Sequence, residues 1–286
     1  MRINSIKIKN LIVGGCSFTA GCGFSDKEDW QKPEKSFHFA HEGLKKHFTE
    51  PFTNGNIRKQ IEQLAYPTLL GKKLNIKNVK NLAVGGMGYP IHTRRIFSYL
   101  LNNQDKINFK ETLVILQLTS LQRPELPHPS PKKDGTINYC FINKEFDSED
   151  YRATSYINEH YDSHYLQLKG LNEISFFNGW CKSMGIKVIF LDFHNWVKTI
   201  KLDEERKNLI TPISTINQHQ YTLFHDSIEY PNIDTILKQM DIVSVDSKRC
   251  GFADFGYHDD AHRPPEGHEI VAENIYNILT KKSNEK

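Results

Sequence analysis

The sequence predicts an α/β fold: a three-layer α/β/α sandwich with a central five-stranded parallel sheet and two or three inserted loop or helical segments. Two observations support this prediction. The chain contains short apolar runs that are typical of strands buried on both faces, and these runs alternate with longer segments of helical period. Strands that alternate with helices imply right-handed crossovers, which make the strands parallel and place helices on both faces of the sheet.

The composition is that of a soluble globular protein. The chain has 286 residues, of which 38% are hydrophobic and 25% charged, which is enough for a sizeable core. Its net charge of +3 is too small to indicate a nucleic-acid partner, which needs a concentrated basic face. No apolar run has the length of a signal peptide or of a membrane span. The five cysteines form no Cys-x-x-Cys pair, so we expect reduced thiols and a cytoplasmic protein.

The first half of the chain contains three expected strands. Leu11–Val13 is a short apolar run that two glycines end, and Asn78–Ala83 precedes a second glycine-rich turn. Thr112–Leu118 has the clearest strand pattern because it is almost continuously apolar, with Gln117 as the exception near its carboxyl end. The helices expected between these strands cover residues 57–74, with a kink or restart at Pro67, and residues 91–101.

The second half of the chain continues the alternation. Leu166–Met184 has a helical period and ends at Gly185, a typical C-cap residue. The strand-like runs Ile186–Phe193 and Asp241–Asp246 follow, and the apolar period after Pro265 predicts a final helix. We expect a single domain over residues 1–286, with insertions at about 23–56, 121–163 and 196–237 that have no clear period.

A candidate nucleophile follows the first strand. Gly14 and Gly15 allow a sharp bend, because glycine has no Cβ, and Ser17 then sits where the chain turns. A serine at the end of a strand can project beside backbone N–H groups that hold a developing oxyanion. Most turns of this kind have no catalytic role, so the motif supports a nucleophile only if the chain also provides a base.

A candidate base and its orienting carboxylate lie near the other end of the chain. His262 follows Asp259 by three residues on one polar loop, directly before the final helix. A nucleophilic serine needs a base within hydrogen-bond reach, and the base needs a carboxylate to fix its tautomer. His268 is less well placed, because we expect it to lie on the helix. The alternative interpretation is a polar loop that only leads into a proline-started helix.

Together the two ends resemble the SGNH/GDSL hydrolase superfamily of flavodoxin-like serine esterases and O-acyltransferases. Gly15–Thr19 is similar to the first sequence block of this family, Gly-Asp-Ser-x-Thr, with Cys16 in the aspartate position. Asp259-x-x-His262 is similar to its last block, and Asn81–Gly86 to its second block. The three blocks occur in the family's order and are spread over most of the chain.

The resemblance implies a catalytic triad of Ser17, His262 and Asp259. It also implies an oxyanion hole formed by the N–H groups of Ser17 and Gly86 and by a side chain after the third strand, where Ser120 falls. The strand order implied by the family is 2-1-3-4-5, in which the loops after the first, second, third and fifth strands meet at one edge of the sheet.

The sequence departs from the family pattern after the third strand. Leu118 replaces a glycine, and Ser120 falls where the family has an asparagine whose amide donates to the oxyanion. The amide of Gln117 or Gln122 is an alternative replacement for this donor. Gln117 is also a candidate for substrate binding, as is Arg123, which could pair with an anionic group of the substrate or form a structural ion pair.

The expected reaction is attack of Ser17 on an ester carbonyl to give an acyl-enzyme, with His262 as base. The resemblance implies a small-molecule or saccharide ester as substrate, from which a small acyl (acetyl) group is removed. If a sugar hydroxyl instead of water resolves the acyl-enzyme, the protein is an O-acetyltransferase. A non-catalytic binding module with a degenerate oxyanion hole is the third alternative, consistent with Leu118 and Ser120.

No metal and no cofactor are assigned. His160 and His164 have the spacing of two ligands on one helix, but no third ligand is evident near them. Cys16 is expected to be a small buried packing residue and is a weaker candidate for the nucleophile. Asp192 and His194 end the fourth expected strand, where they could contact a substrate or cap the strand.

Overall fold

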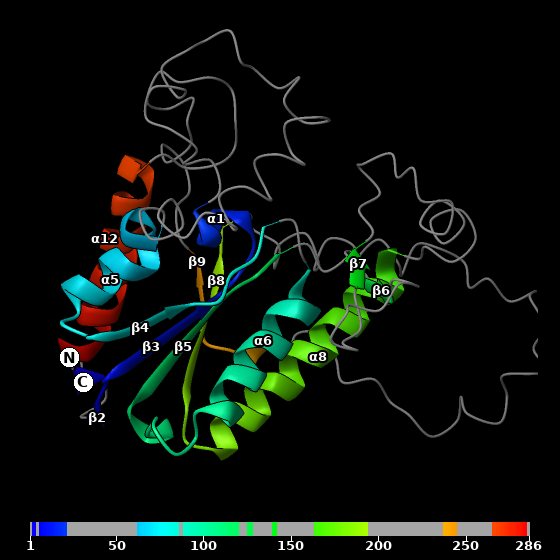
Figure 1. Cartoon of the computed structure of the whole chain (residues 1–286), viewed down its shortest axis with the longest axis horizontal. Helices are drawn as coiled ribbons and strands as arrows, with labels where there is room; N and C mark the ends of the chain where they lie inside the picture. Colours follow the sequence, from blue (N-terminus) through cyan, green and yellow to red (C-terminus); the bar gives the residue numbers. More distant parts are fainter. Residues whose placement is uncertain are drawn as a thin grey trace, which may run out of the picture.

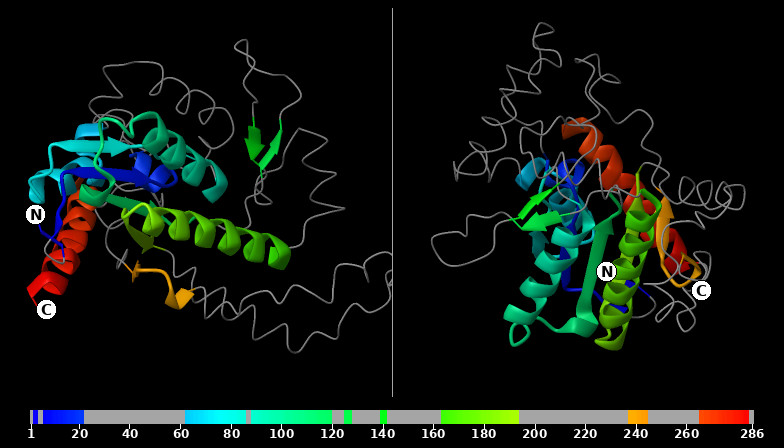
Figure 2. Two further views of the ribbon diagram at one scale, coloured as in Figure 1. Left: turned by 90° about the horizontal axis from the view of Figure 1, so that it is seen from below. Right: turned by 90° about the vertical axis from the view of Figure 1, so that its right-hand side faces the viewer.

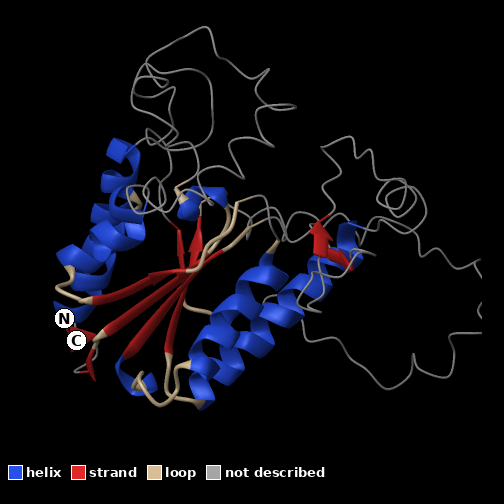
Figure 3. Cartoon of the chain, in the orientation of Figure 1, coloured by secondary structure: helices blue, strands red, loops and turns tan. Residues whose placement is uncertain are grey.

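The computed structural model of the chain describes residues 2–3, 6–21, 62–85, 88–119, 125–127, 139–141, 163–193, 237–244 and 265–284. Five parallel strands form one central sheet, which confirms the expected α/β architecture (Figures 1 and 3). In chain order the strands are β3 (Asn10–Gly14), β4 (Asn78–Asn81), β5 (Thr112–Gln117), β8 (Lys187–Asp192) and β9 (Ile242–Ser244). They lie in the order β4-β3-β5-β8-β9, which is the 2-1-3-4-5 order that the resemblance implied.

Helices cover both faces of this sheet. On one face α5 (Tyr66–Lys73) lies against α12 (Pro265–Asn284), and on the other α6 (Tyr89–Asn102) lies against α8 (Ser163–Ser183), as Figures 1 and 2 show. No helix within the described ranges is both long enough and apolar enough to cross a membrane.

The remaining described elements are short. The helix α1 (Ser17–Ala20) follows β3, and the 3-10 helix η3 (Phe109–Glu111) precedes β5. Two antiparallel pairs stand apart from the central sheet: β1 (Arg2–Ile3) with β2 (Ile6–Lys7), and β6 (Glu125–Pro127) with β7 (Tyr139–Phe141). The second pair lies within the insertion expected at 121–163, whereas the insertions expected at 23–56 and 196–237 fall outside the described residues, apart from Leu237.

The four central residues of β5 are all apolar, because both faces of the strand are covered. Val114 and Leu116 point into the core beneath α6 and α8, whereas Leu113 and Ile115 point into the core beneath α5 and α12. All six residues of the strand are buried. The continuous apolar run therefore reflects burial on two sides, as is typical of parallel sheets.

The helix expected over residues 57–74 is interrupted at Ala65: residues 62–64 are helical, and a new helix follows the break. In the described part of this segment α5 starts at Tyr66, after Ala65 in an extended conformation, and Pro67 occupies its first turn. A proline is tolerated there because the first turn of a helix has no intrahelical use for its N–H. Pro67 therefore marks a new helix start, one of the two outcomes expected for it.

Gly71 allows α5 to lie directly on the edge strand β4. A Cβ built at this position would stand 2.3 Å from Val79 Cγ2. The χ1 angle of valine is stiff, so this neighbour cannot swing aside without moving its backbone. The approach of α5 to the sheet therefore depends on the missing side chain.

We predict that Gly71→Ala lowers the free energy of unfolding by about 1–3 kcal/mol, because overpacking against Val79 outweighs the better helix propensity of alanine. Gly179→Ala is the matched control: it also lies within a helix, α8, but a Cβ built there has no neighbour within 4 Å. That variant should gain about 0.5–1 kcal/mol. Urea unfolding of both variants measures the difference, and equal effects at the two positions would contradict the packing argument.

Cys181 on α8 is a buried thiol in the core between α8 and the sheet, with 0% of its surface exposed. Burial raises the pKa of this thiol to about 12, because the thiolate loses its hydration there. We predict that iodoacetamide at about pH 8 leaves Cys181 unmodified in the native protein, since only roughly one molecule in ten thousand carries the thiolate. Mass spectrometry of the Cys181 peptide checks this, with urea-unfolded protein as the reactive control. Equal labelling before and after unfolding would contradict it.

Candidate active site

Ser17 lies just beyond the carboxyl end of β3, as the first residue of α1 (Figure 1). Ligands bind at this edge in open α/β sheets. The residue is 9% exposed, and its carbonyl accepts a hydrogen bond from the Gly21 N–H at 3.1 Å. Within the described part of the chain, neither its hydroxyl nor its own N–H makes a hydrogen bond. Among the described residues, both groups that a nucleophilic serine uses therefore have no hydrogen-bond partner.

The turn that carries Ser17 is fixed by the side-chain amide of Gln117, at the carboxyl end of β5. The Gln117 Oε1 atom accepts hydrogen bonds from the Cys16 N–H at 3.3 Å and from the Thr19 hydroxyl at 2.5 Å. The Gln117 Nε2 atom donates to Cys16 Sγ at 3.2 Å. A backbone N–H can only donate, so the bond from Cys16 fixes which end of the amide is the oxygen. Gln117 thus contacts the residue before Ser17 and the residue two positions after it.

The network continues from Thr19 to Tyr66 on α5. The hydroxyl oxygens of these two residues are 3.1 Å apart. Thr19 has one hydroxyl hydrogen, which it gives to Gln117 Oε1, so Tyr66 must be the donor in this pair. The order of donation therefore runs from Tyr66 through Thr19 to Gln117.

Gly15 provides the space that Gln117 occupies. A Cβ built on Gly15 would lie 2.6 Å from both Gln117 Oε1 and Thr19 Oγ1, and 2.7 Å from Gln117 Cβ. Contacts this short would force the amide or the turn to move. The glycine that the sequence suggested for a sharp bend is thus also needed for close packing.

The loop after β4 runs beside the Ser17 turn. The Leu82 N–H donates to the Val13 carbonyl at 2.7 Å, and the Val84 N–H donates to the Gly15 carbonyl at 2.9 Å. The Asn81 amide adds a bond to the Thr19 carbonyl at 2.9 Å. These bonds extend the strand pairing beyond β4, along the described residues of the second sequence block.

The C-terminal helix α12 is joined to the same network through His268. Its Nδ1 accepts the Tyr66 N–H at 3.1 Å, which satisfies a donor that the start of α5 would otherwise leave without an intrahelical partner. The two rings stack, with centroids 6.1 Å apart. Because Nδ1 accepts a hydrogen bond, His268 is neutral here, with its proton on Nε2. His268 lies on the helix, as the sequence predicted.

Two further polar side chains are buried at this edge of the sheet. Thr119 follows β5 and is 2% exposed, and its hydroxyl has no hydrogen-bond partner in the described part of the chain. Asp192 ends β8 and is also 2% exposed. Cys16, at 4% exposed, is a buried thiol whose sulfur contacts the Gln117 amide.

Most of the other expected site residues lie outside the described residues. These are Gly86, Ser120, Gln122, Arg123, His160, His194, Asp259 and His262. Their roles stay predictions, as does substrate binding by Gln117, whose amide is engaged with Cys16 and Thr19. The described ranges contain no group of three or more His, Cys, Asp or Glu residues that could hold a metal ion.

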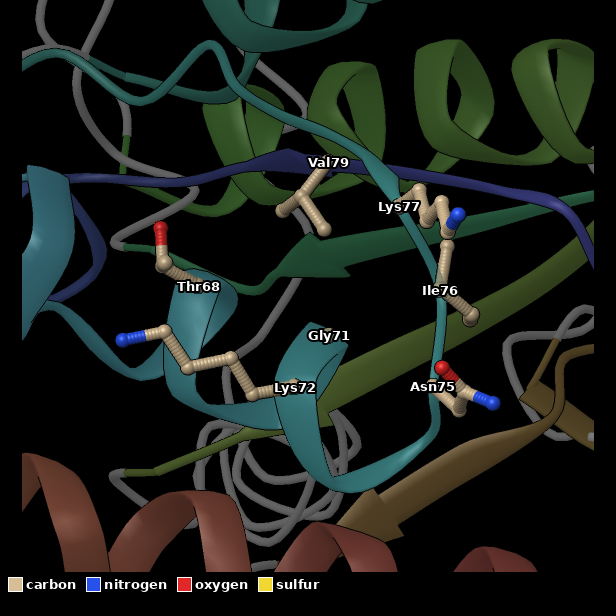
Figure 4. Close-up of a pocket in the computed structure, with 7 residues that line it drawn as sticks. All are labelled: Thr68, Gly71, Lys72, Asn75, Ile76, Lys77 and Val79. Carbon is tan, nitrogen blue, oxygen red and sulfur yellow. The ribbon is translucent and has the colours of Figure 1, made fainter.

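A pocket of about 570 Å³ lies elsewhere, between α5 and the start of β4 (Figure 4). Two lysines line the pocket: Lys72 from α5 and Lys77 from the turn before β4. The pocket lies at the amino end of β4, whereas Ser17 lies beyond the carboxyl end of β3. It is therefore separate from the candidate active site.

Nothing in the sequence indicated Tyr66 as a candidate, and His268 was considered only as a less well placed base. The only local signal for Tyr66 is its position directly before Pro67 at a helix start, and no spacing links it to Thr19 or His268. Gln117 did carry a signal, because it interrupts an otherwise apolar strand. A buried polar residue in such a strand needs partners, but the pattern does not say which ones.

Comparison with models of protein families gives no match, and comparison with curated proteins gives none. Among solved structures, the chain is similar to one reported under the words "The active site of a carbohydrate esterase displays divergent catalytic and non-catalytic binding functions". The two chains are 13% identical, the match covers 98% of this chain and 70% of that one, and the TM-score is 0.43. A likeness of this size carries no argument about activity, so the proposals below rest on the residues of this chain.

We predict that Gly15→Ala displaces the Gln117 amide and lowers the free energy of unfolding by about 1–3 kcal/mol. The same displacement should remove the contacts that cover Cys16 Sγ and make this thiol reactive. Urea unfolding measures the first effect, and iodoacetamide labelling of the Cys16 peptide in the folded variant measures the second. Gly179→Ala is the control, since it should leave Cys16 as unreactive as in the wild type. An unchanged labelling rate in Gly15→Ala would contradict the close packing around Gly15.

Proposed function

We propose that the chain is an SGNH/GDSL-like serine hydrolase that cleaves ester bonds through an acyl-enzyme. Its substrate is a carbohydrate or similar alcohol that carries a small acyl group, acetyl in the simplest case. The nucleophile is Ser17, the base is His262, and Asp259 orients the base. The proposal joins a parallel α/β fold with the sequence blocks that surround these three residues.

The observation that carries the proposal is the hydrogen bonding of the Ser17 turn. The turn around it is tied by side-chain and backbone hydrogen bonds to β5, to α5 and to the loop after β4. Within the described residues, the Ser17 hydroxyl and N–H are nevertheless left without a bond. A fixed turn with a free hydroxyl and a free N–H is what acyl transfer needs, because nucleophile and oxyanion donor must be positioned before the substrate arrives.

In the first step, Ser17 Oγ forms a bond to the ester carbonyl carbon while its proton moves to His262. The carbonyl oxygen takes the negative charge, and the N–H groups of Ser17 and Gly86 stabilise it. The bond between the carbon and the alcohol oxygen then breaks, and His262 returns the proton to the leaving alcohol. Asp259 keeps the histidine in the required tautomer and stabilises its cationic form.

In the second step, water replaces the alcohol. His262 takes a proton from the water as its oxygen attacks the acyl carbon, and the tetrahedral intermediate collapses to the free acid. The proton then returns to Ser17 Oγ, which restores the resting enzyme. If a sugar hydroxyl takes the place of water in this step, the same residues perform O-acyl transfer.

The oxyanion hole differs from the family pattern at its third donor. Leu118 is 5% exposed and packs in the core beneath α6 and α8, so this position is used for packing. We assign the third donor to the Ser120 hydroxyl. A serine hydroxyl reaches less far than an asparagine amide, and loss of one good donor costs about 2.7–4 kcal/mol of transition-state stabilisation. A slower enzyme than a typical family member follows from this assignment.

We predict that a fluorophosphonate probe labels Ser17 and that Ser17→Ala abolishes labelling. The same substitution should lower kcat for p-nitrophenyl acetate by at least about a thousandfold, because the nucleophile is lost. His262→Ala should lower kcat by a similar factor, since the residues of a triad act as a unit. Ser183→Ala is the matched control: it removes an exposed serine hydroxyl at the end of α8 and should leave labelling and kcat unchanged.

The alternatives make different predictions in the same experiments. No labelling of the wild type, together with binding of an acetylated saccharide, would contradict the hydrolase and favour a binding module. Labelling of Ser17 with faster transfer of acetyl to a saccharide acceptor than release of acetate would favour the O-acetyltransferase. Equal rates in wild type, Ser17→Ala and His262→Ala would exclude this triad from the reaction.

A further inference from the structure

We propose that Gln117 is a positioning residue for Ser17: its amide, fixed by the hydroxyls of Thr19 and Tyr66, holds the Cys16–Ser17 turn in the orientation that the reaction needs. This inference rests on the proposed function, because it assigns Gln117 a part in the reaction of Ser17. It differs from the substrate contact that the sequence suggested, since Gln117 acts here through the backbone of the turn.

The contacts of Gln117 lie on both sides of Ser17. Its oxygen accepts the N–H of Cys16, the preceding residue, and the hydroxyl of Thr19, which lies one position beyond Phe18. Rotation of the turn about the Ser17 backbone would therefore break at least one of these bonds. The Cys16 N–H is occupied by this amide, whereas the Ser17 N–H, the next one along the chain, has no acceptor in the described residues. The arrangement leaves the N–H that belongs to the nucleophile for the oxyanion.

The amide is in turn held rigidly. Gln117 and Tyr66 both have 0% of their surface exposed, and the Tyr66 ring packs between Phe193 and His268. The Tyr66 hydroxyl donates to Thr19, which leaves the Thr19 hydrogen for Gln117. A buried network in which the hydroxyl and amide groups find partners has one arrangement, because any rotation leaves a buried polar group without a partner.

A purely structural role for this network makes a different prediction. If Gln117 and Thr19 only stabilise the fold, removal of their bonds lowers the melting temperature and leaves kcat of the folded protein unchanged. If they position Ser17, kcat falls in protein that is still folded at the assay temperature. A misplacement of about 1 Å at a catalytic group can cost about a hundredfold in rate.

The test compares two buried threonines. Thr19→Val removes the hydroxyl that joins Tyr66 to Gln117, and Thr112→Val removes the hydroxyl that bonds Asn108 and Asn10 at the amino end of β5. Both positions are 0% exposed, and both variants keep the side-chain volume. We expect Thr19→Val to lower kcat and the rate of fluorophosphonate labelling by about tenfold to a hundredfold with little change in KM. Thr112→Val should lower only the melting temperature, and Thr19→Ser, which keeps the hydroxyl, should restore most of kcat.

A second test compares the pH dependence of kcat in wild type and in Gln117→Glu. The described titratable groups around this position are the Cys16 thiol and, beyond Thr19, the Tyr66 phenol, and Asp192 follows the register partner Leu191 on β8. A protonated glutamic acid imitates the amide, because its C=O accepts the same two bonds and its O–H can face Cys16 Sγ. Once ionised, it places a negative charge beside the turn where the oxyanion develops. We therefore expect kcat of wild type to rise to a plateau with pH, and kcat of Gln117→Glu to fall again at higher pH.

The outcomes separate this inference from the function on which it rests. If wild type is neither labelled nor active, the proposed function fails and the inference with it. If Ser17 is the nucleophile but Thr19→Val loses no more kcat than Thr112→Val, the inference is overturned and the function stands. The inference is likewise overturned if folded Gln117→Glu keeps the wild-type pH profile. Should Gln117→Glu not fold, the comparison of the two threonines decides alone.

Discussion

The buried amide of Gln117 is the constraint on which the candidate site depends. A side-chain amide with 0% exposed must find its hydrogen bonds within the protein, because the loss of water is otherwise uncompensated. The strand neighbours of Gln117 are apolar, so their side chains offer no hydrogen-bond partner to its amide. Its partners come instead from the turn after β3, which must approach closely enough to donate from Cys16 and Thr19. Gly15 permits that approach because it has no side chain. One polar residue in an apolar strand thus determines how the turn that presents Ser17 is folded.

The same requirement ties the turn to the helix layer above it. Thr19 passes the network to Tyr66 on α5, and the Tyr66 N–H is accepted by His268 on α12. These bonds join residues that are 47 and 202 positions apart in the chain. The apolar core beneath α5 and α12 favours their packing, but apolar burial is non-directional. Hydrogen bonds between buried groups are directional, so they set the register of the two helices with respect to the Ser17 turn.

The sequence contained enough information to predict the fold and to suggest Ser17 as a candidate nucleophile. Apolar runs predicted the strands because both faces of the sheet are covered, and Gly185, with φ of 74°, ends α8 as expected. The pairs β1–β2 and β6–β7 were not predicted, since two or three residues are too few to show a period. The start of α5 depended on Pro67 and not on the apolar period. The roles of Gln117, Tyr66 and His268 depend on contacts between distant residues, for which local patterns carry no signal. Sequence motifs suggest Ser17 as a candidate, but only tertiary contacts reveal which residues hold its turn.

The position of Ser17 within α1 is itself an argument for a chemical role. Serine stabilises a helix mainly at the N-cap, where its hydroxyl accepts a hydrogen bond from the N–H two or three residues on. In α1 the N-cap is Cys16, whose side chain makes no capping bond, and the serine stands one position later. An exchange of the two residues would place a hydroxyl where it stabilises the helix and a small apolar side chain where no bond is made. The sequence has the opposite arrangement, and the Cys16 N–H is bonded by Gln117 from another strand. Helix stability therefore does not explain a serine at this position. The proposed role as a nucleophile is consistent with it, because a nucleophile requires a hydroxyl that no capping bond already occupies.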